Sequence, residues 1–267
     1  MLADLHTHST ASDGQYPPAE LARLAKRRGT EVWALTDHDN LDGLEEAVRA
    51  GTALGLRVIR GVELSADDYL NLHILGYGFS PALLGDWIES LKEGRSSRKY
   101  RIHKFLQTQG VDIPLSEVEE EAGDGAIGRP HFAKVMLRHG IVSTRKEAFD
   151  RYLDTPAFQA IERGTKPSAE RCVKAIREAG GKVSLAHPYQ IVLGGDSLEA
   201  LVDRLAGYGL DAVECYYPQH TPAQQAEYLA LAEKYRLHVT GGSDFHGEQN
   251  KPDNPLAAWE LDTDWLL

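Results

Sequence analysis

The feature that most constrains the fold of this chain is a regular alternation of strand-like and helix-like segments near its start. The opening residues and the segments 31–39 and 57–64 are predicted to be buried strands. Between them, residues 17–29 and 41–55 have the apolar spacing of amphipathic helices, and each ends at a glycine. Because parallel strands need crossover connections, this order predicts a parallel sheet covered by helices.

The same alternation returns in the last third of the chain, after a fourth strand at residues 71–79. Apolar runs predict seven strands in all, the last three at 182–188, 211–217 and 238–246. Helices are predicted between them, at 168–180, 197–207 and 222–235. The sequence therefore predicts an α/β fold built from a barrel-like array of strands and helices.

Residues 81–167 interrupt this pattern with helical segments and no strand signal. The apolar spacing predicts one or two helices that end at Gly110, and two Ser/Thr–Glu pairs have the spacing of a capping box: Ser116 with Glu119, and Thr144 with Glu147. We therefore expect a barrel domain formed by residues 1–80 and 168–267, and a helical insertion at 81–167 that forms the substrate cap.

The composition of the chain limits the kinds of binding partner and the cellular compartment that we expect for it. The formal charge is −11, from 29 basic and 40 acidic residues, which argues against a protein held to nucleic acid or membrane by diffuse positive charge. A local basic pocket is still compatible with this total. Asp4, His6 and His8 interrupt any apolar leader, and no run reaches the roughly 18 apolar residues of a membrane span. We expect a cytoplasmic protein, with Cys172 and Cys215 as buried free thiols.

Histidines and carboxylates gather where the predicted strands end. In parallel α/β folds these ends meet at one edge of the sheet, where chemistry collects. Any one of these histidines is also compatible with a core or loop position, but six of the eleven histidines lie there together with two carboxylates. They are His6, His8, His38, His73, His187 and His246, with Glu63 and Asp244.

A metal centre is the chemistry that this residue set favours. Imidazole and carboxylate together suit zinc, manganese or iron, whereas calcium and magnesium prefer oxygen ligands. Asp13, from the first loop, brings the candidates to nine, enough for three ions if Glu63 bridges two of them. Asp37 and Asp39 flank His38 and either orient its ring or cap a loop or helix.

Five separated motifs occur in the order found in one protein family: "DLHTHSTASDG", "ALTDHDNLDGL", "GVELSA", "LAHP" and "GSDFH". Through them the sequence resembles the PHP (polymerase and histidinol phosphatase) domain phosphoesterases. The resemblance implies a distorted (β/α)7 barrel that carries a trinuclear centre. Histidinol phosphatases of the family often have histidine at the place of Asp13, so the aspartate favours another substrate.

The resemblance also implies a ligand role for all nine candidates, in three groups. One ion is expected at His6, His8, Glu63 and Asp244, a second at Glu63, His73 and His187, and a third at Asp13, His38 and His246. The expected cofactors are two to three divalent ions, with manganese first and iron or zinc as alternatives.

Two motifs of the insertion, "GRPHFAKVM" and "RYLDTPAFQAIERGTKP", resemble a narrower branch of the family. That branch contains 3′,5′-nucleoside bisphosphate phosphatases and 5′ to 3′ exoribonucleases of the ribonuclease AM type. Pro130 suits the first position of a helix, so Arg129 and His131 flank amides that could bind a phosphate. An ordinary capped surface helix is the alternative. Lys166 and His220 are further substrate-binding candidates, or solvated loop residues.

The expected function is a metal-dependent phosphoesterase, with Asp244, Glu63, Arg129 and His131 as its catalytic residues. It is expected to hydrolyse the 3′-phosphate of nucleoside 3′,5′-bisphosphates, to trim short 5′-phosphorylated RNA from the 5′ end, or both. Alternatives are a histidinol-phosphatase-like or other small phosphomonoester phosphatase, an amidohydrolase-type metallohydrolase, and a binding module that has lost ligands. No membrane and no stable protein partner is implied.

Overall fold

The computed structural model describes residues 1–96, 98–123, 127–162 and 166–266, and the side chains of 92–96 and 162 lie outside this description. The chain separates into two compact units. One is formed by Met1–Trp87 and Pro167–Leu267, and the other by Ile88–Lys166. The boundaries predicted from the sequence, at residues 80 and 168, fall near these.

The first unit contains a single eight-stranded sheet in the order β7-β6-β5-β4-β3-β2-β1-β8. Two backbone hydrogen bonds join the two sides of the sheet, from Leu5 N to Gly241 O and from His8 N to Phe245 O. The sheet therefore forms a nearly closed barrel. Apolar side chains such as Val32, Ile59 and Tyr77 fill the core. The strands are β1 (Leu2–Asp4), β2 (Val32–Leu35), β3 (Arg57–Ser65), β4 (His73–Tyr77), β5 (Lys182–Leu185), β6 (Ala212–Tyr216), β7 (His238–Gly241) and β8 (Trp259–Glu260).

The expectation of a wholly parallel sheet is wrong at β4, which pairs antiparallel with both β3 and β5. Only residues 66–72 connect β3 to β4, and a parallel crossover needs about a dozen residues or more. The reversal has a consequence for the site. Because Ser65 at the end of β3 pairs with His73 at the start of β4, His73 lies at the same edge as the carboxyl ends of the parallel strands.

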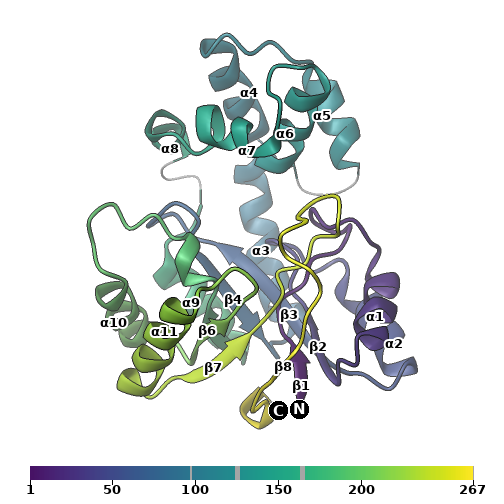
Figure 1. Ribbon diagram of the computed structural model, residues 1–267, viewed down its shortest axis with the longest axis vertical. Helices are drawn as coiled ribbons and strands as arrows, with labels where there is room; N and C mark the ends of the chain where they lie inside the picture. The colour runs from purple at the N-terminus through teal and green to yellow at the C-terminus, as the bar shows by residue number, and fades with distance from the viewer. Residues whose placement is uncertain (97, 124–126, 163–165, 267) are drawn as a thin grey trace. The chain divides into compact units, whose positions relative to one another are not determined.

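Helices cover the sheet where the sequence places them (Figure 1). α1 (Pro18–Arg27) and α2 (Leu44–Ala53) pack together beside β2 and β3. α9 (Ala169–Glu178), α10 (Leu198–Tyr208) and α11 (Pro222–Tyr235) cover the other half of the sheet. Side-chain caps begin the last three, since Ser168, Ser197 and Thr221 each accept a bond from a backbone amide of the first turn.

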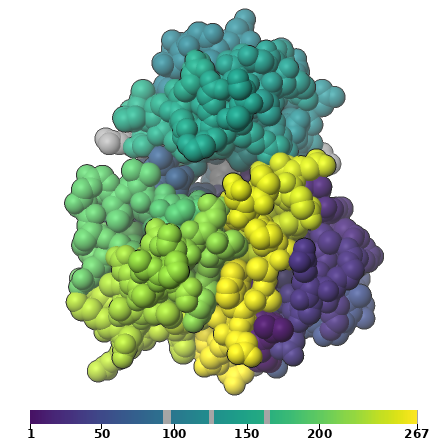
Figure 2. Space-filling model, in the orientation of Figure 1, coloured from purple at the N-terminus to yellow at the C-terminus, as the bar shows by residue number. Residues whose placement is uncertain are grey.

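The eighth strand was missed because it has only two residues, too few for an apolar pattern. β8 pairs antiparallel with β1, which brings the two termini together at the edge of the barrel (Figure 1). The segment after β7 runs between the N-terminal helices and the α11 region before it reaches this strand (Figure 2). It therefore fills the space between the two sides of the barrel.

The second unit is helical and has its own core, built on Ile102, Phe132 and Phe158. The Thr144 capping box is present, because Thr144 Oγ1 accepts from the amide of Glu147. The Ser116 box is wrong: Pro114 precedes the first residue of its helix, so Ser116 lies inside it. The elements are α3 (Pro81–Ser96, which begins in the first unit), α4 (Arg98–Thr108), α5 (Leu115–Ala122), α6 (Arg129–Arg138), α7 (Arg145–Ala148), the π-helical turn Phe149–Leu153 and α8 (Pro156–Glu162).

Two smaller expectations concern the thiols and the membrane. Cys172 and Cys215 are both buried and free, as predicted. Among the residues that the structure describes, no helix combines the length and the apolar character needed to cross a bilayer.

Candidate metal centre

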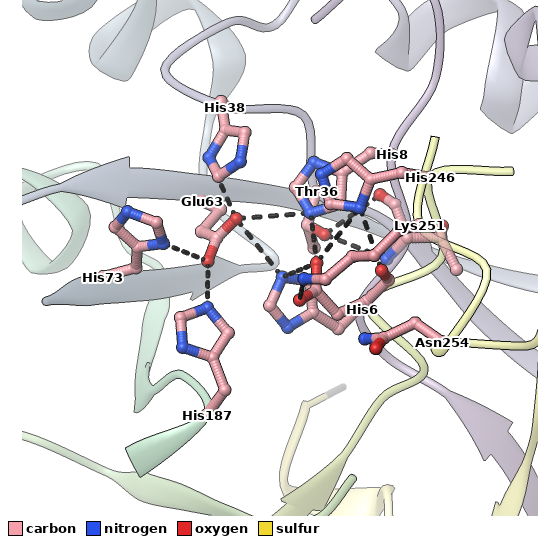
Figure 3. Close-up of polar contacts among 12 residues, drawn as sticks. His6, His8, Thr36, His38, Glu63, His73, His187, His246, Lys251 and Asn254 are labelled. Carbon is pink, nitrogen blue, oxygen red and sulfur yellow. Dashed lines mark hydrogen bonds and ion pairs between the residues drawn. The ribbon is translucent and has the colours of Figure 1, made fainter. Parts of the chain in front are cut away.

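The predicted donors lie around one end of the barrel because each follows, ends or begins a strand there. His6 and His8 come directly after β1, and His38 follows β2. Glu63 is near the end of β3, while His73 opens the antiparallel β4. The remaining donors follow β5 (His187) or β7 (Asp244, His246) or lie in the first loop (Asp13). Figure 3 shows most of these side chains converging on Glu63.

Glu63 is fully buried and is the hub of the cluster. Its Oε1 lies 2.8 Å from His73 Nδ1 and 2.8 Å from His187 Nε2. Its Oε2 lies within 3.0–3.3 Å of ring nitrogens from three more residues: His38, His8 and His6. Each oxygen of this carboxylate thus faces a different set of histidines, which is the arrangement expected of a ligand shared between ions.

Three groups of donors are compact enough to hold an ion each, with all atoms of a group within 4.8 Å of one another. The first matches the group expected from the sequence, and Glu63 recurs in the second. His8 and His38 each take part in two groups, and His187 contacts Glu63 without belonging to any of the three. The groups are His6, His8, Glu63 and Asp244; His38, Glu63 and His73; and His8, Asp13, His38 and His246.

Buried polar atoms without hydrogen-bond partners test whether these residues fit a metal. Among the described residues, His6 Nε2, both ring nitrogens of His8 and Glu63 Oε2 are buried and make no hydrogen bond. Leaving such groups unsatisfied costs about 1–3 kcal/mol each, so native proteins rarely do so without a ligand. The unpartnered atoms face one another across short distances, and divalent cations would satisfy them.

Burial and neighbouring charges shift the pKa values of the cluster residues in different directions. Burial would raise the pKa of Glu63, but the surrounding histidines, His38 above all, lower it well below its usual value. Burial would lower the pKa of His38, yet Glu63 and Asp13 raise it to about 9, whereas burial lowers the pKa of His73 to about 3. Burial also lowers the pKa of His246, so these two histidines stay neutral and keep a lone pair for a metal.

The side chains of the cluster are buried to different degrees. The side chains of His6, His8 and Glu63 are fully buried, but His38, His73 and Asp13 are 24%, 13% and 11% exposed. The groups that contain His38 are thus the more exposed ones, and each of them has a single carboxylate.

The two oxygens of Asp244 contact different groups, and the contacts of the second oxygen were not predicted from the sequence. Its Oδ1 lies 3.2 Å from His8 Nε2, on the side of the cluster. Its Oδ2 accepts from Tyr217 OH at 2.7 Å and pairs with the ammonium of Lys251. Asn254 donates to the same Tyr217 hydroxyl. The only sequence signal for Lys251 is its place seven residues after Asp244, which does not distinguish it from a surface lysine.

The loop that carries Asp13 is held by Asp37, and the structure gives this as the role of Asp37 rather than orientation of His38. Asp37 accepts from the amide and hydroxyl of Ser9, both at 2.7 Å, and from Ser12 Oγ at 2.6 Å. Gly14 closes this loop against the backbone of His8, where a Cβ would clash. Asp39, in turn, accepts from the amide of Ser65. Asp13 itself reaches His246 Nε2 at 3.2 Å.

In the insertion, Arg129 and His131 both lie at the start of α6, where Arg129 is the first residue and Pro130 the second. His131 is buried, and its Nδ1 accepts from the amide of Gly128 at 2.9 Å, so this nitrogen caps the helix. Arg129 forms an ion pair with Asp154 and packs against the Phe149 ring. The helix end is therefore capped, and its guanidinium has a carboxylate partner.

Lys166 and His220 lie in different units. Lys166 acts electrostatically on Asp154, which places it in the same charged surroundings as Arg129. His220 follows β6 and packs among the rings of Tyr189, Tyr217 and Tyr228. Its Nδ1 donates to the carbonyl of Cys215, and burial lowers its pKa, so the ring is neutral. Residues 163–165 of the second insertion motif lie outside the described part of the chain.

A comparison with protein families decides the assignment. Residues 4–180 match the PHP domain family. The chain belongs to the PHP family. This stretch contains His6, Asp13, His38, Glu63 and His73, so the family match and the metal-like cluster involve the same part of the sequence.

Curated relatives cover nearly the whole chain. A 5′–3′ exoribonuclease from Haemophilus influenzae is 33% identical over 91% of this chain and 89% of its own length. A phosphoribosyl 1,2-cyclic phosphate 1,2-diphosphodiesterase from Eggerthella lenta is 31% identical over 93% and 95%. A 3′,5′-nucleoside bisphosphate phosphatase from Chromobacterium violaceum is 32% identical over 91% and 86%. All three names describe hydrolysis of phosphate esters.

Solved structures agree with the fold. A Chromobacterium violaceum protein called an amidohydrolase, with bound sulfate and no metal, has a TM-score of 0.86 and 29% identity, and covers 97% of this chain and 92% of its own. A Bifidobacterium adolescentis protein to which metal-dependent phosphoesterase activity is ascribed has a TM-score of 0.83 and 30% identity, over 99% and 93%. The present chain is accordingly a PHP-type phosphoesterase with a mixed α/β barrel, and its clustered donors suit divalent metals.

Proposed function

We propose that this phosphoesterase removes the 3′-phosphate of nucleoside 3′,5′-bisphosphates, trims short 5′-phosphorylated RNA from its 5′ end, or does both. The observation that carries the proposal is the sharing of donors between three groups around one buried carboxylate, Glu63. Relatives named for both reactions match the chain over about nine-tenths of its length.

The cofactors of this proposal are two to three divalent ions, manganese first, with iron or zinc as alternatives. The donors are six histidines and three carboxylates: His6, His8, Asp13, His38, Glu63, His73, His187, Asp244 and His246. A set in which imidazole nitrogens outnumber oxygens disfavours calcium and magnesium. When bound, such ions supply a Lewis acid for phosphoryl oxygens and a water-derived nucleophile at neutral pH.

The insertion supplies the contacts to a substrate phosphate. Arg129 pairs with Asp154, and Lys166 also acts electrostatically on Asp154, so this part of the second unit brings two cations close together. A guanidinium binds phosphate in a bidentate way, and the amides at the start of α6 favour an anion. His131 orients this helix end, and His220, in the first unit, is the further candidate for a contact to the substrate.

The test uses purified protein loaded with Mn²⁺ and four substrates. Phosphate release is measured from 3′-phosphoadenosine 5′-phosphate and from histidinol phosphate, and nucleotide release from one short RNA with either a 5′-phosphate or a 5′-hydroxyl. We expect turnover of the bisphosphate and of the 5′-phosphorylated RNA. Preference for histidinol phosphate, or equal cleavage of the two RNAs, would refute the proposed substrate.

A histidinol-phosphatase-like activity is the alternative within the phosphoesterases, and Asp13 is the residue that argues against it. One solved structure that resembles this chain is named an amidohydrolase, which is the second alternative. The curated relatives reported above are named for phosphate chemistry.

A further inference from the structure

Glu214 is a fully buried carboxylate that lies beside the cluster without belonging to any of its three donor groups. It projects from β6, whose neighbours in the sheet are β5 and β7. Both of its oxygens are engaged with residues of the cluster. Oε1 lies 3.0 Å from His6 Nδ1, and Oε2 accepts from the backbone amide of His187 at 2.7 Å.

The contact with His6 decides which of its ring nitrogens carries the proton. In the tautomer in which Nδ1 of a neutral His6 donates to this carboxylate, Nε2 keeps its lone pair. Nε2 points toward two other carboxylates, 3.3 Å from Glu63 Oε2 and 3.7 Å from Asp244 Oδ1, and makes no hydrogen bond. Glu214 thus aims an unprotonated nitrogen at the place where an ion would lie.

The contact with His187 holds an unfavourable backbone conformation. His187 has φ 22° and ψ 68°, in a region that residues other than glycine rarely adopt, and such strain persists only where the surroundings impose it. The hydrogen bond from its backbone amide to Glu214 Oε2 is one such constraint. With the backbone turned in this way, His187 Nε2 reaches Glu63 Oε1 at 2.8 Å.

Gly242 leaves the room that this arrangement needs. A Cβ there would clash with the Cβ of His6 and lie 2.8 Å from Glu214 Oε1. The pair of His6 and Glu214 therefore occupies space that a larger residue in the segment after β7 would fill.

We propose that Glu214 is a positioning residue of the metal centre, which fixes the ring tautomer of His6 and the backbone of His187 at the same time. This inference rests on the proposed role of His6 as a ligand. Partners of this kind that hold metal-binding histidines typically contribute about 10- to 100-fold in metal affinity.

The variant Glu214→Gln tests this, because it keeps the shape of the side chain. The side chain of glutamine has one oxygen that accepts and one amide group that donates. It can therefore accept a hydrogen bond from His6 Nδ1 or from the backbone amide of His187, but not from both. Asp211→Asn is the matched control: Asp211 precedes the same strand at its opposite end, where it binds the amide of Val183 and pairs with Arg177. Zn²⁺ affinity is measured by chelator competition, and folding by urea denaturation.

We expect Zn²⁺ binding by Glu214→Gln to be about 10- to 100-fold weaker at one or more sites, with that of Asp211→Asn unchanged. Wild-type affinity in a folded Glu214→Gln variant would overturn the positioning role alone. Absence of Zn²⁺ binding by the wild-type protein would refute the metal centre itself, and this proposal with it.

A measurement on the wild-type protein keeps the inference testable even if the variant does not fold. In Zn²⁺-loaded protein with ¹⁵N-labelled histidine, His6 should show a protonated Nδ1 and a zinc-bound Nε2, and His6→Gln identifies its signals. A purely structural Glu214 would not determine this pattern. Zinc on Nδ1 of His6, or a proton on Nε2, would contradict the assignment.

Discussion

Glu63→Gln is the substitution with the largest expected effect on the centre. Glu63 takes part in two of the three donor groups, whereas Asp13 takes part in one. Without the Glu63 carboxylate, one group keeps His6, His8 and Asp244, but the other keeps only His38 and His73. Two protein ligands are fewer than the three usual at a catalytic site, so this variant should lose at least one ion and weaken a second.

Asp13→Asn provides the matched comparison, since it also replaces a carboxylate by its amide. It leaves both Glu63-containing groups intact and three histidines in the group that it alters: His8, His38 and His246. We expect kcat/KM to fall by about 10³-fold or more in Glu63→Gln, equivalent to about 4 kcal/mol of transition-state stabilisation, and by about 10–100-fold in Asp13→Asn.

The assay combines elemental analysis after Mn²⁺ reconstitution with phosphate release from the bisphosphate substrate. Urea denaturation confirms that both variants fold, which the near-identical shapes of Glu and Gln favour. The reasoning fails if Glu63→Gln keeps the wild-type metal content and rate, or if Asp13→Asn loses more metal than Glu63→Gln.

Three further substitutions test single groups. Burial raises the pKa of Asp4 from 3.8 to about 7, so ionisation of Asp4 destabilises the folded state. In chelator-treated protein, the free energy of unfolding of the wild type relative to Asp4→Asn should therefore fall by about 2–3 kcal/mol from pH 5 to pH 8. A difference in urea unfolding that stays constant over this range would contradict the prediction. Arg129→Ala should lower kcat/KM at least about tenfold at unchanged metal content, with partial rescue by lysine, while wild-type kinetics would leave Arg129 as only the partner of Asp154. Lys251→Met removes the ammonium beside Asp244 Oδ2 and should lower kcat/KM about tenfold; an unchanged rate would show that Lys251 only neutralises that oxygen.

The sequence predicted the seven main strands and the edge at which chemistry collects, because each apolar run is followed by polar residues that cannot continue a buried strand. It did not predict the direction of β4. That direction depends on the length of the connection at 66–72, which an apolar pattern does not register. His73 still reaches the site, since the amino end of a reversed strand lies beside the carboxyl ends of its neighbours.

Sequence reasoning found the donors but not the residues that support them. Motif spacing identifies side chains that are close along the chain, such as His6 and His8. Glu214 and His6 are 208 residues apart in the sequence, and closure of the barrel brings them together. Glu214 lies in the predicted strand 211–217, where one acidic residue is equally compatible with a solvent-exposed position.

The start of α6 shows how local charge and total charge lead to different expectations. The chain carries −11 overall, yet Arg129 and Lys166 both act on one carboxylate, Asp154, whose pKa is raised by burial and by the nearby Asp150. Two cations and two carboxylates therefore meet in this region, and a phosphate that binds there competes with Asp154 for Arg129. Each phosphate neutralised by lysine or arginine adds to the salt dependence of binding. Two such cations suit one terminal phosphate of a nucleotide or short RNA better than the backbone of a long one.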